Sequence, residues 1–281
     1  MKSLILVSCI GLICIIASGS ADKLNPEGLH ELEKQECGVH KKDLPFIGNE
    51  NIPSSRPWMA RIKVSIDGKD PIEYIGTLIS DQFVLTAAHI VDNTKIHSVR
   101  LGVGENSTVE EIDVEKIITH PDFKLNPITY NDIALVKLAR KVDFKENISP
   151  ICLPVNEDLQ QKVETLEGLL LTGFSNGNTN TERNNILREI NVSRVDRQKC
   201  WMSFQKDFPI EPTQICTTLN EIVCKGSSGS PLSSQVEYLG KERFVQFGIV
   251  SFGLGDCSLG ANTNVASFMP WITAVIGEKP L

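Results

Sequence analysis

Three segments of the sequence hold the residue types that acyl transfer by a serine requires. They are Leu85-Thr86-Ala87-Ala88-His89, Asn131-Asp132-Ile133-Ala134-Leu135 and Cys224-Lys225-Gly226-Ser227-Ser228-Gly229-Ser230-Pro231. Such chemistry needs a base that takes the hydroxyl proton, a carboxylate that orients this base, and N–H donors that stabilise the developing oxyanion. His89, Asp132 and Ser228 can supply the base, the carboxylate and the attacking hydroxyl. Their chain order differs from that of subtilisin-like enzymes and α/β-hydrolases.

The elements that must position these residues are short strands. From Trp58 onward, β-rich runs separated by Gly, Asn and Asp are typical of an all-β sandwich or barrel. They include residues 58–66, 74–79, 83–86, 132–138, 168–174 and 244–252. One helix is predicted at the C-terminus, where Phe268, Trp271, Ile272, Val275 and Ile276 recur at helical spacing.

The N-terminal region predicts a secreted protein. Residues 1–21 combine Lys2, an apolar run from Leu4 to Ile16 and a series of small residues, as a signal peptide does. The run is shorter than the roughly 20 residues that cross a bilayer. Residues 22–45 are charged with little apolar periodicity, which predicts a tethered leader, and residues 46–281 are expected to form the main domain.

Charge and histidine spacing exclude several functions. The formal net charge is −7, and it becomes −8 once Lys2 leaves with the signal, which argues against nucleic acid and anionic membranes as partners. The five histidines lack ligand-like spacing with cysteines, so neither a metal site nor another cofactor is expected. Among them, His30, His40 and His97 are predicted to be solvated surface residues.

The cysteines and sequons fit an extracellular protein. Six cysteines remain after the signal, and an even number predicts three disulfides, with 15 pairings possible by counting alone. They are Cys37, Cys152, Cys200, Cys216, Cys224 and Cys257. Asn106, Asn147 and Asn191 begin glycosylation sequons.

Taken with the three segments, further motifs resemble the chymotrypsin/trypsin family of serine proteases. They are, in family order, Tyr74-Ile75-Gly76-Thr77-Leu78-Ile79-Ser80, Pro150-Ile151-Cys152-Leu153-Pro154, Thr172-Gly173-Phe174, Gly248-Ile249-Val250-Ser251-Phe252-Gly253 and Trp271-Ile272. The resemblance covers nearly everything from Phe46 onward. The loops and the leader cysteine look most like arthropod extracellular proteases of the clip-associated kind, here without a clip module.

The resemblance implies a fold and a role for each site residue. The fold is two antiparallel Greek-key β-barrels with a C-terminal helix, and the triad lies in the cleft between them. His89 is then the general base, Asp132 its orienting partner and Ser228 the nucleophile, with the backbone N–H groups of Gly226 and Ser228 as the oxyanion hole. Ser251 is expected beside Asp132, and Ser251-Phe252-Gly253 is the edge that pairs with an extended substrate.

The same resemblance selects one disulfide pattern. It pairs Cys37 with Cys152, Cys200 with Cys216, and Cys224 with Cys257. A further pair common in the family is replaced by Tyr74 and Ile90.

Two departures concern the family's activation switch. Activation normally follows cleavage after Arg or Lys, and the new amino group pairs with an Asp just before the nucleophile. Here the junction reads Pro45-Phe46-Ile47-Gly48-Asn49, and Ser227 stands in place of that Asp. A hydroxyl cannot neutralise a buried ammonium. Ser230 also replaces a glycine, which restricts the backbone beside the site.

The specificity pocket is assigned by counting back from Ser228. Ile222 falls at the pocket base, and Gly253 and Gly260 leave its walls open. An active form is therefore expected to prefer an apolar side chain over Lys or Arg. A shift of one position in this alignment places Glu221 at the base instead.

Two functions follow from these observations. The first is a secreted, monomeric serine endopeptidase acting on proteins or peptides. The alternative is a non-catalytic protease homologue that binds proteases, inhibitors or substrates in an extracellular cascade.

Overall fold

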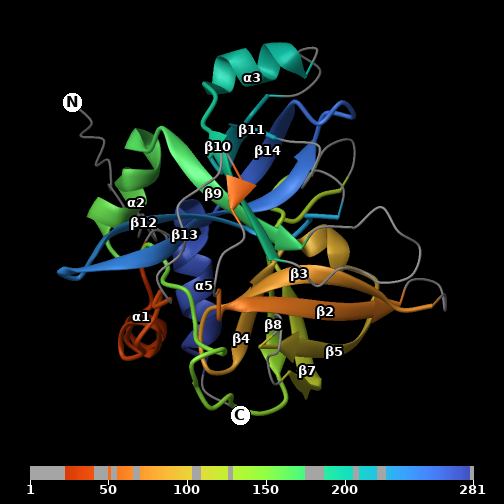
Figure 1. Cartoon of the computed structure of the whole chain (residues 1–281), viewed down its shortest axis with the longest axis vertical. Helices are drawn as coiled ribbons and strands as arrows, with labels where there is room; N and C mark the ends of the chain where they lie inside the picture. Colours follow the sequence, from red (N-terminus) through yellow and green to blue (C-terminus); the bar gives the residue numbers. More distant parts are fainter. Residues whose placement is uncertain are drawn as a thin grey trace, which may run out of the picture.

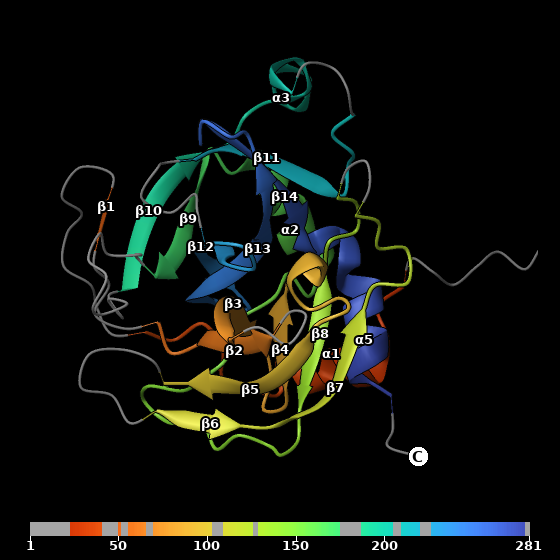
Figure 2. The same ribbon diagram turned by 90° about the vertical axis from the view of Figure 1, so that its right-hand side faces the viewer.

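Two antiparallel β-sheets form the framework of the described part of the chain (Figures 1 and 2). The computed structural model describes residues 23–40, 50–51, 56–65, 70–102, 109–125, 129–174, 187–204, 209–219 and 226–278. Each sheet has seven strands within these residues and is curled into a barrel-like form. The predicted pair of antiparallel β-barrels is therefore confirmed.

The first sheet contains the strand that precedes His89 and the strand that follows Asp132. Its strand order is β6 (Glu110–Ile112), β5 (Lys95–Leu101), β2 (Met59–Ser65), β3 (Ile72–Leu78), β4 (Phe83–Thr86), β8 (Ala134–Leu138) and β7 (Val114–Thr119). Strand β4 is buried along its whole length, which explains its unbroken apolar sequence.

The second sheet carries the segments around Ser228 and Ser251. Its order is β1 (Glu50–Asn51), β10 (Leu187–Ser193), β9 (Gly168–Phe174), β12 (Pro231–Tyr238), β13 (Lys241–Gly253), β14 (Leu259–Asn264) and β11 (Gln214–Thr218). Trp58, fully buried before β2, lies 5.4 Å from the ring of Phe244 on β13, so one apolar core joins the two sheets.

Among the described residues, four α-helices accompany the sheets. They are α1 (Pro26–Glu33), α2 (Glu157–Thr165), α3 (Arg197–Ser203) and α5 (Met269–Ile276). The predicted C-terminal helix is confirmed as α5, with Ile272, Val275 and Ile276 buried. Each of the other three begins at a capping side chain, from Asn25, Asn156 and Asp196. No helix among the described residues is long and apolar enough to cross a membrane.

In the segment predicted to be a tethered leader, α1 packs directly on α5 (Figure 2). The backbone N–H of Asn25 donates to Thr273 Oγ1 at 2.9 Å, and Leu32 is 5% exposed. Gly28 touches the helix so closely that a Cβ there would lie 1.8 Å from the carbonyl oxygen of Thr273. A disulfide from Cys37 to Cys152 holds the end of this segment. Residues 26–33 of the predicted leader thus form a helix that the sequence analysis did not predict.

Gly28→Ala is therefore expected to lower the free energy of unfolding by about 1–3 kcal/mol, because the added methyl group overpacks the contact with α5. At a domain of this size, each kcal/mol lowers the melting temperature by roughly 2–4 °C. The matched control is Gly255→Ala, where a Cβ meets nothing within 4 Å. Calorimetry that finds the two variants equally stable would contradict close docking of the leader.

The prediction that three histidines are solvated holds only for His30, which is exposed. His40 is half-buried, with its ring edge-on to Phe244 at 4.6 Å between centroids. His97 is also half-buried, and its Nε2 lies 2.7 Å from Ser65 Oγ. Both side chains pack against a neighbouring strand, His40 against β13 and His97 against β2. The spacing of histidines in the sequence does not reveal such contacts.

Candidate active site

A short helical turn presents the His89 side chain. It follows β4 directly, and its flanking residues Ala88 and Ile90 are buried. Their burial fixes the turn against the first sheet and leaves His89 facing outward, with a side chain that is 21% exposed. A rigid strand therefore positions an imidazole that solvent or a ligand can reach.

Asp132 is the buried partner of this imidazole. Its side chain is 1% exposed, and Asn131 before it adopts a positive φ of 51° that turns the chain into position. Asp132 Oδ1 accepts from the backbone N–H of His89 at 2.9 Å, and Oδ2 lies 2.7 Å from His89 Nδ1. An ionised carboxylate only accepts hydrogen bonds, so the pair places the proton on Nδ1 and leaves Nε2 free as a base.

Two residues of the second sheet hold Asp132 from the other side. Ser251 Oγ, on β13, donates to Asp132 Oδ2 at 2.5 Å, as the resemblance implies. Thr263 Oγ1, on β14, donates to the Asp132 carbonyl oxygen at 2.8 Å. Thr263 was not predicted, because only the pairing of β14 with β13 brings it to Asp132. The carboxylate therefore lies at the junction of the two sheets.

The Ser228 loop lies against the same junction. Gly229, at a φ of 82°, approaches the first sheet so closely that a Cβ would lie 2.1 Å from the Ile75 carbonyl oxygen and 2.5 Å from Thr86 Oγ1. Its N–H donates to the Val250 carbonyl at 3.0 Å, next to Ser251. Ser228 is thus placed between the segments that carry His89 and Ser251.

The described structure does not bring every predicted site residue into contact with the others. Between the described residues Ser228 and His89 no hydrogen bond forms, and such bonds commonly tighten only when a ligand is bound. Gly226, a predicted oxyanion donor, is exposed and has a φ of 89°. Ile222 and Glu221, the alternatives for the pocket base, lie outside the described residues, as do Pro45 and Phe46.

The serines that replace family residues in this loop are both buried. Ser227 is 3% exposed, so the position that an Asp would occupy is shielded from water. Ser230 is fully buried, and its Oγ has no hydrogen-bond partner. Ser230 does not adopt a positive φ. A serine therefore fits this backbone position without strain, although a glycine was expected there.

The disulfides brace the elements around the site. Cys37 is bonded to Cys152 and Cys200 to Cys216, the latter tying α3 to β11. Both pairs are those that the resemblance implies. Cys257 is also disulfide-bonded, and its expected partner Cys224 lies outside the described residues.

An ion network joins strands β2, β3 and β5 of the first sheet. Glu73 binds Arg61 at 2.9 Å and Arg100 at 2.8 Å, and the Arg61 guanidinium lies 3.9 Å from the ring centroid of Phe174. Burial alone raises the pKa of Glu73, but the hydrogen bonds and charges of the two arginines hold it below its ordinary value. Glu73 therefore stays ionised and is not a proton donor at neutral pH.

His120 is half-buried at the end of β7. Its ring packs on Phe268 at 5.1 Å and on Trp271 at 5.2 Å between centroids. Burial lowers its pKa, against a smaller opposing effect of Asp122. His120 is therefore a neutral packing residue at pH 7.

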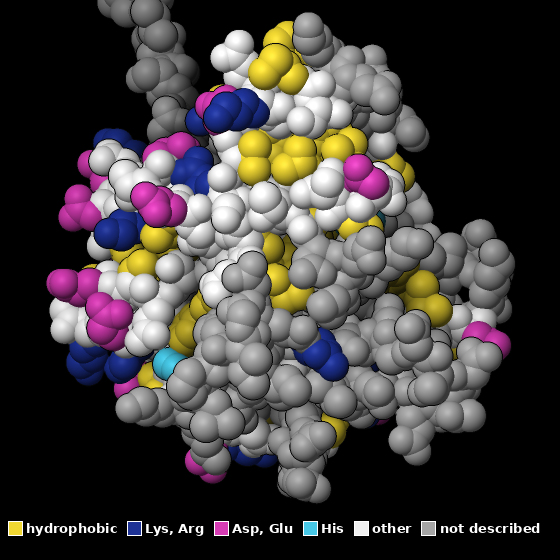
Figure 3. Space-filling view, turned by 45° about the horizontal axis from the view of Figure 1, so that its top comes forward, with side chains coloured by type: hydrophobic (Ala, Val, Ile, Leu, Met, Phe, Trp, Pro, Cys, Tyr) yellow, Lys and Arg dark blue, Asp and Glu magenta, His cyan; other side chains and the backbone are white. Residues whose placement is uncertain are grey.

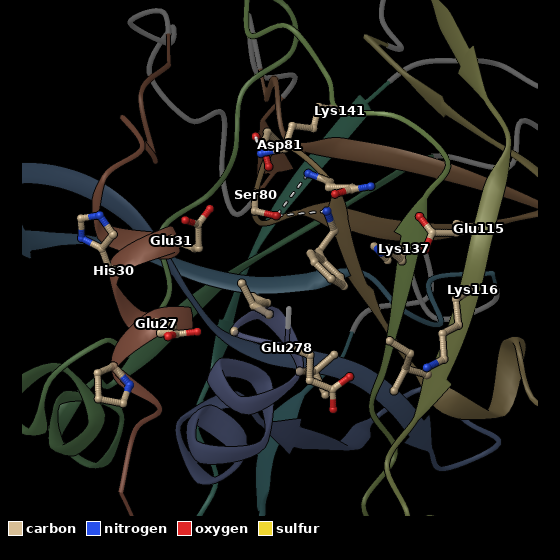
Figure 4. Close-up of a pocket in the computed structure, with 17 residues that line it drawn as sticks. Glu27, His30, Glu31, Ser80, Asp81, Glu115, Lys116, Lys137, Lys141 and Glu278 are labelled. Carbon is tan, nitrogen blue, oxygen red and sulfur yellow. Dashed lines mark hydrogen bonds and ion pairs between the residues drawn. The ribbon is translucent and has the colours of Figure 1, made fainter. Parts of the chain in front are cut away.

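A separate cavity of about 870 Å³ lies away from these residues. Figure 4 shows it between α1, α5 and strands β7 and β8, with Glu27, Glu31, Lys116 and Glu278 around it. Two ion pairs, Lys137 with Glu115 and Lys141 with Asp81, neutralise much of its rim. None of the predicted site residues lines it, so cavity size does not locate the chemistry in this protein.

Comparisons with known proteins agree with this geometry. The family model described as Trypsin matches residues 46–272. The chain is 32% identical to "Serine protease grass" of Drosophila melanogaster over 276 residues, which cover 89% of this chain and 72% of that protein. It is 30% identical to "CLIP domain-containing serine protease HP8" of Bombyx mori over 287 residues, covering 93% and 77% of the two chains.

A solved structure extends the likeness to three dimensions. It is the crystal structure of the Drosophila Grass clip serine protease of the Toll pathway, with a TM-score of 0.78 and 29% identity. The match covers 90% of this chain and 78% of that one.

Proposed function

Because this chain belongs to the trypsin family of serine proteases, we propose that it is a secreted serine endopeptidase that hydrolyses peptide bonds through an acyl-enzyme. The observation that carries the proposal is the buried Asp132 carboxylate, which accepts hydrogen bonds from both the backbone and the ring of His89 and from Ser251. This arrangement fixes one tautomer of one imidazole, and general-base catalysis requires that tautomer.

In the proposed mechanism, His89 Nε2 takes the proton of Ser228 as its oxygen attacks the substrate carbonyl. The imidazolium is stabilised by Asp132, and it then protonates the leaving amine. Water repeats the sequence and releases the acid. The backbone N–H groups of Gly226 and Ser228 stabilise the oxyanion in both halves of the reaction.

The domain organisation belongs to the same proposal. Residues 1–21 are the signal peptide, residues 22–45 the leader, and residues 46–281 the protease domain. The Cys37–Cys152 disulfide keeps the leader attached if the chain is cut near residue 45. Because this chain is similar to the Drosophila Grass clip serine protease of the Toll pathway, we propose that it acts in an extracellular protease cascade.

The proposed partners are proteins and peptides. On the described part of the face drawn in Figure 3, acidic and basic side chains lie interspersed along the left side, without a broad field of a single sign. Such a surface offers little attraction to nucleic acid or to anionic lipid.

Ser227 favours one alternative, a protease homologue that binds without cutting. It is a buried hydroxyl where activation of the family needs a carboxylate, and Pro45 stands where the activating cut needs a basic residue. In that alternative the chain still binds proteases or substrates, but its oxyanion loop never becomes ordered.

A fluorophosphonate probe tests the proposal, because it reacts with a serine that a neighbouring base activates. We expect mass spectrometry of the secreted protein to place the label on Ser228, and Ser228→Ala to abolish it. Ser230→Ala is the matched control, since Ser230 is buried two residues further along, and this variant should label as the wild type does. Labelling that persists in Ser228→Ala would overturn the assignment of the nucleophile.

A further inference from the structure

We propose that Asn147 carries an N-linked glycan whose first N-acetylglucosamine packs into a groove between the leader and the protease domain. Asn147 begins one of the three sequons of the sequence, and the groove, of about 530 Å³, lies beside it. The inference goes beyond the proposed endopeptidase activity. It rests on the proposed secretion, because sequons are glycosylated in chains that enter the secretory pathway.

A tight turn presents Asn147 next to this groove. Lys145 and Ile148 exchange both backbone hydrogen bonds, at 2.8 and 3.0 Å, so Glu146 and Asn147 form the tip of a two-residue hairpin turn. Ile148 is fully buried and anchors the turn on the domain, whereas Asn147 is half-buried at its tip. Glu146 and Ser149 both line the groove. The acceptor residue is therefore flanked on both sides by groove residues.

Two exposed apolar side chains line the groove from different segments of the chain. Phe144 and Val39 are each 38% exposed. Phe144 is the most exposed aromatic side chain in the described part of the chain, and it lies three residues before Asn147. The face of an aromatic ring is electronegative and attracts the C–H groups on one face of a sugar ring. A sugar on Asn147 would therefore cover apolar surface that is otherwise in contact with water.

The leader side of the groove is fixed on the domain. The N–H of Gly38 donates to the Pro150 carbonyl at 2.8 Å, and the Gly38 carbonyl accepts from the N–H of Phe244 at 3.1 Å. The ring of His40, which also lines the groove, packs edge-on against Phe244 at 4.6 Å between centroids. Val39 lies between these two fixed residues. Packing a sugar against it therefore costs the protein little conformational entropy.

The charges of the groove favour a neutral ligand. Glu36 binds Arg243 at 3.1 Å, and Lys145 binds Glu110. Among the described residues that line the groove, Lys145 is the only lysine or arginine. Because its ammonium is already paired with a carboxylate, an anionic ligand would find no unmatched cation there. An uncharged N-acetylglucosamine needs none.

The sequon at Asn191 has no such groove beside it. Asn191 is exposed on β10, where it pairs with Leu170 of β9. It lines neither the cavity of about 870 Å³ nor the groove of about 530 Å³. A glycan at Asn191 is therefore expected to extend into solvent, which makes this sequon an internal control. Asn106 lies outside the described residues.

The modification is a transfer from an oligosaccharide linked to a polyprenyl diphosphate. The bond between C1 of the first N-acetylglucosamine and the diphosphate breaks. The side-chain nitrogen of Asn147 forms a bond to C1 and loses one proton, and the polyprenyl diphosphate leaves. The amide keeps one N–H and stays neutral, so the glycan changes no charge at the turn.

The test starts from protein that carries high-mannose glycans and is collected from the culture medium. Endoglycosidase H leaves one N-acetylglucosamine on each occupied asparagine, and mass spectrometry of peptides then identifies the sites. We expect the peptide that contains Asn147 to carry this sugar. Ser149→Ala removes the sequon but keeps Asn147, and it should carry none. Ser149→Thr keeps the sequon and should carry the sugar.

Thermal melts of the trimmed proteins test the packing. Ser149→Ala should lower the melting temperature by about 2–4 °C, the shift that one aromatic contact gives in a domain of this size. In the Phe144→Ala background the same substitution should change the melting temperature little, because the sugar has lost the ring. Ser193→Ala is the matched control at the Asn191 sequon and should leave the melting temperature unchanged.

The outcomes separate this inference from the proposed function. A bare Asn147 in the secreted protein would overturn the glycan, and equal losses of melting temperature with and without Phe144 would overturn its packing. If cells that express the chain release none of it, the proposed secretion fails and this inference fails with it. Neither measurement uses Ser228, so an inactive protease leaves the inference standing.

Discussion

Asp132→Asn is expected to lower kcat by about 10⁴-fold without unfolding the protein, the size of the same change in the family's best-studied triad. The physical reason lies in the hydrogen bond of 2.7 Å between Asp132 Oδ2 and His89 Nδ1. An asparagine amide that donates to Nδ1 pins the proton on Nε2, and that nitrogen can no longer accept the proton of Ser228.

The measurement is the kcat of an activated form on a peptide ester, alongside a thermal melt. Asp158→Asn is the matched control, since Asp158 is exposed in the first turn of α2 and should leave kcat unchanged. A loss of less than about tenfold in Asp132→Asn would remove Asp132 from the proposed triad.

Restoring the activation switch is expected to have the second largest effect. Pro45→Arg with Phe46→Ile supplies a cleavable bond and a new amino terminus, and Ser227→Asp supplies the carboxylate that receives it. Either half alone should change activity little. An ammonium has no buried partner without the carboxylate, and an unpaired buried charge typically costs about 3–5 kcal/mol.

The three substitutions together should raise kcat/KM by about 10²–10³-fold after treatment with a trypsin-like activator, the contribution of a single oxyanion donor. This gain should exceed the sum of the gains of the two partial variants, because the residues act as one network. The controls are Pro45→Arg with Phe46→Ile alone and Ser227→Asp alone, both treated in the same way. Additive effects would show that the two positions are not coupled.

Features encoded by local sequence could be predicted without the structure. Strands β4 and β8 follow from apolar runs, and the segments around His89 and Asp132 each follow from a short motif at the end or start of such a run. Ser251 and the pairing of Cys37 with Cys152 came from the family resemblance. These predictions needed no knowledge of how distant strands pair.

The features that were missed depend on tertiary packing. Helix α1 carries few apolar residues and packs on α5 through a close contact that Gly28 allows. Helix α2 buries just Leu159 and Val163, too few to produce a clear helical period. Thr263 reaches Asp132 through the register of β14 with β13, and no local sequence pattern encodes that register.

The most direct test of the whole account is the rate at which a fluorophosphonate labels Ser228 in the untreated secreted protein and in the activated triple variant. The account predicts label on Ser228 in both, with the wild type slower by about 10²–10³-fold because its oxyanion loop lacks the activation pair. Equal rates would contradict the role assigned to Pro45 and Ser227. An activated variant that stays unlabelled would contradict the proposed endopeptidase itself.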